Sequence, residues 1–211
     1  MKQPLPHFPH LRGTTGSMGF NIYRAGEKEL INGCLSGDRS AQQKLYDVYS
    51  PKAYALCCRY LKDPMQAEDA LVTAFTRILK KLHQYKGEGS LEGWIKTIVI
   101  REALTIIRKN QQLRLETDLE NMDQQAMMQI HSDPLEAEDL LNLISELPTG
   151  YRTVFNMYAI DGYSHKEIAD QLGISENTSK SQLSRARNYL QNLLARNDHY
   201  QTPTSNDATA R

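Results

Sequence analysis

Apolar residues recur at intervals of three and four positions along the first half of the chain. They stand at Leu45, Val48, Tyr49, Leu56, Tyr60, Leu71, Phe75, Ile78, Leu79 and Leu82. This period is that of an amphipathic α-helix, and no alternating run of apolar and polar residues indicates a strand. The spacing therefore predicts that residues 26–110 form one bundle of about four helices.

Residues with capping chemistry mark where two of these helices begin. Asp63 and Pro64 precede the apolar pattern of residues 65–82, and proline is favoured at the first position of a helix. Ser90 follows the glycine-containing turn at residues 86–89 and can accept a hydrogen bond from the first turn of a helix that carries Trp94.

The composition changes after this bundle. Residues 111–133 are rich in Gln, Asp, Glu and Met and keep no sustained period, so we expect a flexible linker with room for a short helix around residues 123–130. Helical spacing returns after Pro134, and the apolar positions are Leu140, Leu141, Ile144, Leu147, Val154, Phe155 and Tyr158. The segments 1–25 and 198–211 are expected to be disordered.

These patterns predict an all-α fold of two small helical domains, residues 26–110 and 134–197, joined by an acidic linker. The second domain carries the clearest local motif. Ser164 can cap a short helix, Gly173 can end it in the left-handed conformation, and Ser175 can cap the next helix. That next helix places Ser179, Leu183, Ala186 and Leu190 on one stripe. Two helices joined by a short turn with glycine are typical of a helix–turn–helix.

The face of the second helix away from this stripe is polar. It carries Asn177, Ser181, Ser184, Arg185 and Asn188, with Thr178 and Lys180 at its edges. From residue 177 to residue 196 there are four basic residues and no acidic one. Small polar side chains followed by basic ones suit entry into the DNA major groove. The alternative is a solvated helix of an ordinary bundle, which would usually mix acidic residues with the basic ones.

A second basic surface is expected in the first domain. Residues 77–109 hold eight basic and three acidic residues, with Tyr85 and Trp94 among them. One helical face or its edge carries Thr97, Arg101, Thr105, Arg108 and Lys109. Cations beside aromatic rings suit a nucleic-acid strand whose bases are unstacked, although a core position for Trp94 is the alternative.

The formal net charge of zero hides an uneven distribution. The 25 basic and 25 acidic residues give a net charge of +4 over residues 26–110, −8 over residues 111–147 and +2 over residues 148–197. Two basic blocks thus flank an acidic connector, and overall neutrality does not exclude a nucleic-acid partner.

Residues that would carry enzyme chemistry do not occur in the required spacings. The six histidines are scattered, and the chain has neither an HExxH nor a CxxC motif. Glu68 and Asp69 are adjacent carboxylates, but they stand near a helix start, where the helix dipole accounts for them. We therefore expect no catalytic residue, metal, cofactor or small-molecule substrate, and a protein that is not an enzyme.

The sequence also favours a cytoplasmic location. It has no apolar run of about 18 residues that could span a bilayer, and residues 1–21 lack the continuous apolar segment of a signal peptide. Cys34, Cys57 and Cys58 have no metal-ligand spacing, and we expect reduced, mostly buried thiols.

Several segments together resemble the small, two-domain extracytoplasmic-function (ECF) type of bacterial RNA polymerase sigma factor. In the first domain they are QAEDAL at 66–71, Phe75, LHQYKGEGSLEGWI at 82–95 and residues 100–109. In the second domain they are ELP at 146–148, RTVF at 152–155, GYSHKEIA at 162–169, LGIS at 172–175 and SKSQLSRAR at 179–187.

The resemblance implies a role for each domain in transcription initiation. The first would bind core polymerase through Glu68, Asp69 and Phe75, and would hold the opened −10 promoter element with residues 86–91 and the Thr97, Arg101 and Arg108 face. The second would read the −35 element as duplex DNA through residues 177–187, which adds Gln182 and Arg187 to the expected DNA-binding residues. The acidic linker would pass near the polymerase cleft, and a membrane-linked anti-sigma inhibitor would clamp the two domains.

Two other functions remain open from the residues alone. One is an autonomous helix–turn–helix regulator whose first domain dimerises or senses a ligand. The other is a helical interaction module whose basic faces bind acidic proteins. Only a sigma factor would let core polymerase start transcription at a promoter.

Overall fold

Eight α-helices, one 3₁₀ turn and one π-helical turn make up the regular structure in the part of the chain that the computed structural model describes. That part comprises the backbone of residues 19–117 and 137–200 and the side chains of residues 26–110 and 140–194. No strand occurs among these residues, which confirms the predicted all-α fold.

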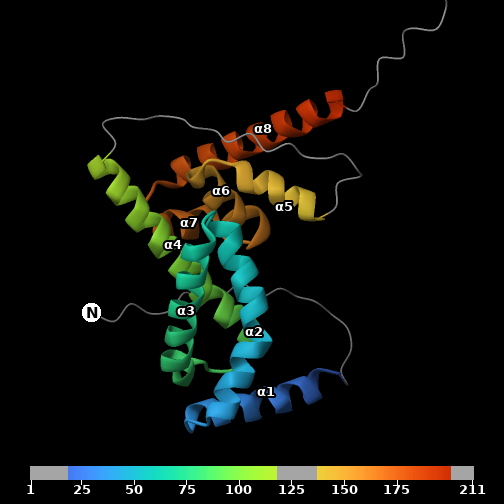
Figure 1. Ribbon diagram of the computed structural model, residues 1–211, viewed down its shortest axis with the longest axis vertical. Coiled ribbons are helices and arrows are strands. Elements are labelled where there is room, and N and C mark those ends of the chain that lie inside the picture. The colour runs from blue at the N-terminus through green and yellow to red at the C-terminus, as the bar shows by residue number, and fades with distance from the viewer. Residues whose placement is uncertain (1–18, 118–136, 201–211) are drawn as a thin grey trace, which may run out of the picture.

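The N-terminal domain is a bundle of the four helices that the periodicity predicts. They are α1 (Gly19–Leu35), α2 (Arg39–Tyr60), α3 (Pro64–Lys81) and α4 (Leu91–Thr117), with the 3₁₀ turn η1 (Leu82–Gln84) after α3. Helices α2, α3 and α4 contact one another, and α1 crosses one end of the bundle against α2 (Figure 1). A Cβ atom on Gly33 would lie 2.7 Å from the Cβ of Ala41, so a glycine is needed where α1 approaches α2.

The predicted helix starts are confirmed. The Asp63 side chain accepts a hydrogen bond from the Met65 N–H at 3.0 Å, with Pro64 at the first helical position. The Ser90 Oγ accepts one from the Gly93 N–H at 3.1 Å. Both side chains thus satisfy backbone donors that lack a partner in the first turn of a helix.

Three helices extend beyond the segment boundaries expected from the sequence. Helix α1 begins at Gly19, within the segment 1–25 that we expected to be disordered, and α4 continues to Thr117, into the expected linker. Helix α8 continues to Tyr200, beyond the expected end at residue 197. No glycine or proline interrupts residues 94–117 or 176–200, so neither α4 nor α8 meets a residue that would end it. The expected short helix at 123–130 lies outside the described residues.

The bundle core contains most of the apolar positions in the pattern. Leu45, Tyr60, Ile78, Leu82, Leu91, Ile100 and Leu104 are fully buried. Val48 is an exception, because it is 52% exposed. Cys34 and Cys57 are buried and Cys58 is exposed, and all three are free thiols.

One charged residue also lies in this core. Glu102 is buried on α4, and its carboxylate forms an ion pair of 2.6 Å with Arg77 of α3. Burial raises the pKa of Glu102, while the charges of Arg77 and Lys81 oppose the shift. The ion pair therefore offsets part of the cost of placing a carboxylate among apolar side chains.

The C-terminal domain consists of α5 (Ala137–Glu146), α6 (Thr149–Phe155), the π-helical turn η2 (Asn156–Ile160), α7 (His165–Leu172) and α8 (Glu176–Tyr200). Its own core joins Leu143, Ile144 and Leu147 to Ala186 and Leu190. Leu140 and Leu141, two apolar positions of the predicted helical pattern, are 46% and 47% exposed. Only the C-terminal half of α5 packs against α8, and this leaves those two leucines outside the contact.

The two domains pack against each other. Val154, Met157, Ile168 and Leu183 of the C-terminal domain belong to the same buried cluster as the N-terminal bundle. In Figure 1, α6 and α7 lie at the end of the bundle opposite α1. The described parts of the chain therefore share a continuous apolar core across the domain boundary.

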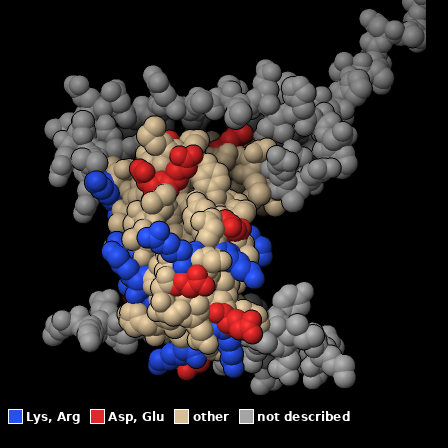
Figure 2. Space-filling view, turned by 60° about the horizontal axis from the view of Figure 1, so that its bottom comes forward, with Lys and Arg blue, Asp and Glu red and all other residues tan. Residues whose placement is uncertain are grey.

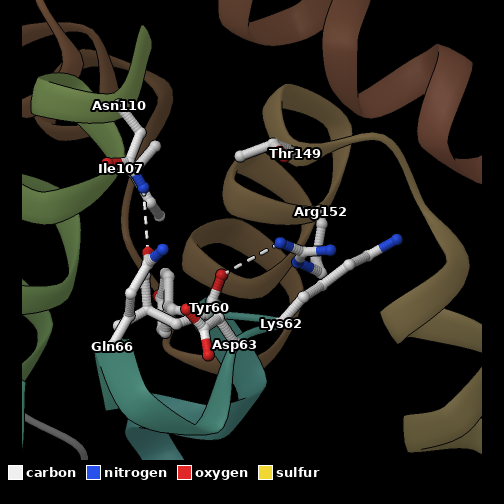
Figure 3. Close-up of a pocket in the computed structure, with 9 residues that line it drawn as sticks. Tyr60, Lys62, Asp63, Gln66, Ile107, Asn110, Thr149 and Arg152 are labelled. Carbon is white, nitrogen blue, oxygen red and sulfur yellow. Dashed lines mark hydrogen bonds between the residues drawn. The ribbon is translucent and has the colours of Figure 1, made fainter. Parts of the chain in front are cut away.

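Polar contacts at this boundary cap the C-terminal end of α2. The Arg152 Nη2 donates a hydrogen bond to the Tyr60 carbonyl at 3.1 Å (Figure 3), and the Asn156 Nδ2 donates one to the Arg59 carbonyl at 2.9 Å. The Arg152 Nη1 also bonds the carbonyls of Ser145 and Leu147. Burial lowers the pKa of Arg152 to about 10. The guanidinium thus donates to a carbonyl group at the C-terminal end of α2, where the helix dipole favours a cation.

Replacement of Arg77 by methionine is expected to leave Glu102 buried without its ion-pair partner. The free energy of unfolding should fall by roughly 1–3 kcal/mol, between the values for exposed and buried pairs, because Arg77 is half-exposed. Burial raises the pKa of Glu102 above its unfolded value. Stability is therefore lost as the pH rises through these two pKa values, and the loss in R77M should be larger at pH 8 than at pH 5.

Urea unfolding followed by circular dichroism at both pH values measures this effect. The double variant R77M/E102Q is the control, since it removes the charge together with its partner. It should recover most of the stability and lose the pH dependence. Equal stability of R77M and the unsubstituted protein at pH 8 would contradict the expectation.

Candidate polymerase and nucleic-acid interfaces

A helix–turn–helix forms at α7 and α8, and three local interactions define its turn. The Ser164 Oγ accepts a hydrogen bond from the Glu167 N–H at 3.2 Å, and the Glu167 carboxylate accepts one from the Ser164 N–H at 2.8 Å, which completes a capping box. Gly173 ends α7 with a left-handed φ of 69°. The Ser175 Oγ accepts a hydrogen bond from the Thr178 N–H at 3.0 Å. All three predicted capping positions are confirmed.

The outer face of α8 is polar and open. Its exposed residues are Asn177, Lys180, Ser181, Ser184, Arg185, Arg187 and Asn188. Thr178 is half-buried, and Lys180 lies 4.0 Å from Glu176. The predicted stripe of Ser179, Leu183, Ala186 and Leu190 is buried. The helix therefore presents hydrogen-bonding groups to solvent along one side and fixes its orientation with the other.

Ser179 is the polar member of the buried stripe, and a histidine provides the hydrogen-bond partner of its hydroxyl group. The Ser179 Oγ lies 2.9 Å from the His165 Nδ1, and the His165 ring stacks on Tyr158 with 4.4 Å between centroids. Burial lowers the pKa of His165, and the charge of Lys180 adds to the shift. The lowered pKa favours the neutral imidazole, whose Nδ1 can donate a hydrogen bond to the Ser179 hydroxyl or accept one from it, depending on the tautomer.

Gln182 lies differently from its neighbours in the expected DNA-binding set. It is half-buried, and a Cβ atom on Gly150 of α6 would lie 3.4 Å from its Oε1. Gln182 follows Ser179 by three positions and precedes Ala186 by four, so it stands at the edge of the buried stripe. Gln182, which we expected to contact DNA, therefore lies at the border of the open face, next to Gly150 of α6.

The expected face on α4 is formed in part by side chains that bond to their own helix. The Thr97 Oγ1 donates to the Gly93 carbonyl at 3.0 Å, and the Thr105 Oγ1 donates to the Arg101 carbonyl at 2.7 Å. Thr105, Arg108 and Lys109 are exposed, whereas Thr97 and Arg101 are half-buried. The face is therefore open towards the end of α4 and partly covered near its middle.

Tyr163 of the C-terminal domain accounts for this partial cover. Burial raises the pKa of Tyr163, and the charge of Asp161 adds to the shift. The charge of Arg101 and the nearby polar side chains of Gln171 and Thr97 oppose it. Tyr163 thus lies beside both half-buried residues of the α4 face.

The aromatic pair near the start of α4 lies between core and surface. The rings of Tyr85 and Trp94 are 5.7 Å apart and tilted by 50°. Both side chains are half-buried, and the Tyr85 hydroxyl donates to the Gly89 carbonyl at 3.0 Å, which ties the preceding loop together. Trp94 is therefore neither a fully buried core residue nor a fully exposed ring.

The expected polymerase-binding segment presents a mixed surface on α3. Glu68 and Asp69 are exposed. Met65 and Val72 lie one turn away on the same side of the helix and are 73% and 62% exposed. Sequence reasoning missed these two apolar residues, although their spacing of three and four from the carboxylates was visible.

Phe75 does not share this surface. It is 5% exposed, and its ring packs edge-on against Tyr46 of α2 with 4.8 Å between centroids. Phe75 follows Leu71 by four positions and precedes Ile78 by three, so it belongs to the buried side of α3. The expectation that Phe75 contacts polymerase is corrected: it supports α3 from within the bundle.

A buried carboxylate joins the two domains next to the α4 face. Asp161 follows η2, and its side chain has no exposed surface. Its Oδ1 lies 2.6 Å from the Arg59 Nη2 and 2.8 Å from the Lys96 Nζ, and its Oδ2 accepts a hydrogen bond of 2.5 Å from the Tyr60 hydroxyl. Burial raises the pKa of Tyr60, and the Asp161 charge adds to the shift. Three donors of the N-terminal domain therefore converge on one carboxylate of the other domain.

A cavity opens beside this contact, at the domain boundary (Figure 3). Its volume is about 270 Å³, and its lining includes Lys62, Gln66, Asn110 and Arg152. The Asn110 Nδ2 donates to the Gln66 Oε1 at 2.9 Å and links α4 to α3 across one wall. Burial lowers the pKa of Lys62, and the Arg152 charge adds to the shift.

Charge on the surface is mixed rather than uniform. On the face drawn in Figure 2, Lys and Arg side chains alternate with Asp and Glu. Among the residues that the structure describes, no group of three or more His, Cys, Asp or Glu side chains could hold a metal ion. None of the described helices combines the length and the apolar character that crossing a membrane requires.

Comparison with known proteins identifies both domains. Residues 45–113 match the family model for Sigma-70 region 2, and residues 137–190 match that for Sigma-70, region 4. The chain is 30% identical over 179 residues to the ECF RNA polymerase sigma factor SigW of Bacillus subtilis, which covers 79% of this chain and 96% of SigW.

A second curated relative and a solved structure are also similar. The chain is 27% identical over 169 residues to the ECF RNA polymerase sigma factor SigE of Mycolicibacterium smegmatis, which covers 76% of this chain and 65% of SigE. The solved structure is that of the sigma factor RpoE in complex with the anti-sigma factor NepR from Bartonella quintana. It is 23% identical with a TM-score of 0.48 and covers 72% of this chain and 96% of that one.

Replacement of Gly173 by alanine is expected to lower the free energy of unfolding by about 1 kcal/mol, because alanine resists the left-handed conformation. Gly26 provides a matched control, since a Cβ atom at either glycine would meet nothing within 4 Å and Gly26 lies inside α1. Gly26→Ala should therefore raise stability by roughly 0.5–1 kcal/mol. Thermal unfolding of both variants checks the pair, and shifts of the same sign would contradict the assignment.

Proposed function

Because this chain belongs to the ECF family of RNA polymerase sigma factors, we propose that its two domains contact polymerase and promoter DNA through the three surfaces described above. The chain is an alternative sigma factor, which directs core polymerase to promoters and initiates transcription. The observation that carries the proposal is the presence, on one chain and in this order, of a region 2 domain and a region 4 helix–turn–helix whose polar face is open.

The polymerase contact is assigned to the outer face of α3. Glu68 and Asp69 offer carboxylates to a basic partner, and Met65 and Val72 offer apolar area beside them. Apolar groups surrounded by charge are typical of protein–protein interfaces, because the apolar area drives association and the charges set the orientation. The combination of charge and apolar area on this surface is stronger support for a contact with core polymerase than any single residue on α3.

The opened −10 element is assigned to α4 and to the loop before it. Thr97, Arg101, Thr105, Arg108 and Lys109 line one side of the helix, and the loop at residues 86–91 adds Lys86. Arginine and lysine can follow the phosphates of a single strand, and the Tyr85–Trp94 pair offers ring surface on which a base can stack.

The −35 element is assigned to α8. Its open face begins with short polar side chains at Asn177 and Ser181, which allow close approach to base edges in the major groove. Arg185 and Arg187 follow and can reach guanine or phosphate. Lys180, Ser184 and the half-buried Thr178 complete the set.

The remaining assignments concern regulation and location. We place the protein in the cytoplasm, without enzyme activity of its own, and the acidic residues of the connector against basic surface in the polymerase cleft. An anti-sigma inhibitor, anchored to the membrane, would act by holding the two domains. The near-zero net charge suits a subunit that polymerase delivers to DNA.

Reconstituted transcription tests this function directly. Core polymerase with the purified chain should start transcripts at discrete promoters in genomic DNA, whereas core polymerase alone should not. The chain alone should shift promoter fragments weakly in a gel, because its charges are balanced. Tight, specific binding without polymerase, together with no initiation, would indicate an autonomous regulator instead.

Single arginine variants test the two DNA surfaces separately. R185A and R101A should each reduce initiation at such a promoter by about tenfold, the effect of losing one good contact to a base or phosphate. K166A and K80A are the matched controls, because each removes an exposed charge of the same domain outside the assigned surfaces. Initiation unchanged in R185A and R101A would contradict the assignment, and so would an equal loss in the controls.

A further inference from the structure

Arg59, Lys96 and Tyr60 form a ready-made anion site on the N-terminal domain. We propose that this site binds a backbone phosphate of the opened promoter strand, and that Asp161 occupies it when the two domains are packed together. This inference rests on the proposed function, since it names an additional contact to the same DNA. It also assigns Asp161 the role of an internal competitor.

The donor set has the chemistry of a phosphate site. A guanidinium, an ammonium and a phenolic hydroxyl reach the two oxygens of one carboxylate at 2.6, 2.8 and 2.5 Å. Arginine and lysine supply charge-assisted hydrogen bonds to phosphate in the same way. The Asp161 carboxylate therefore stands where an oxyanion of the nucleic acid would stand.

A carboxylate leaves part of this donor set unused. The Nε of Arg59 is buried and has no hydrogen-bond partner in the described structure. A buried N–H without an acceptor is costly. The two charged oxygens of a backbone phosphate are arranged tetrahedrally around phosphorus rather than in the plane of a carboxylate, so a phosphate can approach the Arg59 Nε that Asp161 leaves without a partner.

The site adjoins the surface assigned to the −10 element. Lys96 precedes Thr97 on α4, and Arg101 follows little more than one turn later. The segment that supplies Asp161 also supplies Tyr163, which lies beside Thr97 and Arg101. A strand bound along α4 would therefore meet both Asp161 and Tyr163, and packing of the domains and DNA binding exclude each other.

This competition predicts weak binding of nucleic acid by the isolated chain. The single negative charge of Asp161 offsets one of the two positive charges of Arg59 and Lys96 and occupies a donor of each. Separation of the domains exposes both cations and the α4 face in one step. Because the same two cations bind either anion, DNA and the packed conformation are linked reciprocally.

Binding of a fluorescein-labelled single-stranded DNA 20-mer of mixed sequence to the full chain tests the proposal. D161N should bind about tenfold more tightly than the unsubstituted protein at 0.1 M salt, because the site loses its internal anion. D170N is the matched control, since it removes an exposed carboxylate of the same domain. D170N should change the affinity little, and an equal gain in both variants would overturn the proposal.

Two further substitutions test whether the gain in DNA affinity of D161N arises at the proposed site. R59Q and K96Q, introduced together into D161N, should return the affinity to that of the unsubstituted protein or below it. Persistence of the tighter binding in this triple variant would overturn the assignment of the site. Small-angle scattering should show a larger radius of gyration for D161N than for D170N, and identical values would exclude separation of the domains.

A measurement on the unsubstituted chain covers the case in which a variant fails to fold. Hydrogen exchange at residues 161–163 should accelerate when the 20-mer is added in excess, and unchanged exchange would overturn the proposal. The proposed function is judged separately, by promoter-dependent initiation with the unsubstituted chain. If the unsubstituted chain initiates transcription but D161N and D170N bind the 20-mer with equal affinity, only the Asp161 competition is rejected. Lack of initiation by the unsubstituted chain would reject the proposed function.

Discussion

The carbonyl groups at the C-terminal end of α2 need hydrogen-bond partners, and the C-terminal domain supplies them. Arg152 donates a hydrogen bond to the Tyr60 carbonyl, and Asn156 donates one to the Arg59 carbonyl. The Asp161 carboxylate binds the side chains of the same two residues, Arg59 and Tyr60. The last two carbonyl groups of this helix are thus satisfied from the other domain. Together with the shared apolar core, these contacts place the helix–turn–helix domain against the N-terminal bundle and determine which parts of the two proposed DNA surfaces are open.

The helix–turn–helix could be predicted in detail because its determinants are local. Ser164, Gly173 and Ser175 act within a few residues of their own positions, and their capping roles follow from side-chain chemistry and backbone conformation. The buried and open sides of α8 follow from helical periodicity in the same way. Gln182 stands at the edge of the stripe, where periodicity alone does not decide whether a side chain is buried or open.

The remaining features depend on contacts between residues distant in sequence. Asp161 and its partner Arg59 are 102 positions apart, and no spacing rule relates them. Glu102 on α4 pairs with Arg77 on α3. Because the partner lies on another helix, the sequence showed only that a charged residue interrupts the apolar stripe of α4. Phe75 was assigned to the surface by family resemblance, although its own spacing on α3 agrees with the core. Here the physical pattern predicted the structure better than the resemblance did.

The surfaces of the packed conformation differ in their availability, and this difference suggests an order of events. The α3 face with Glu68, Asp69, Met65 and Val72 is open while the domains are together. The α4 face is partly covered by Tyr163 and adjoins the site that Asp161 fills. If these surfaces act as proposed, polymerase engages the packed chain first, whereas the opened strand requires the domains to separate. If Asp161 competes as proposed, an internal ion pair reduces non-specific DNA binding by a sigma factor of zero net charge. The cations of this ion pair then become available to DNA only within the polymerase complex.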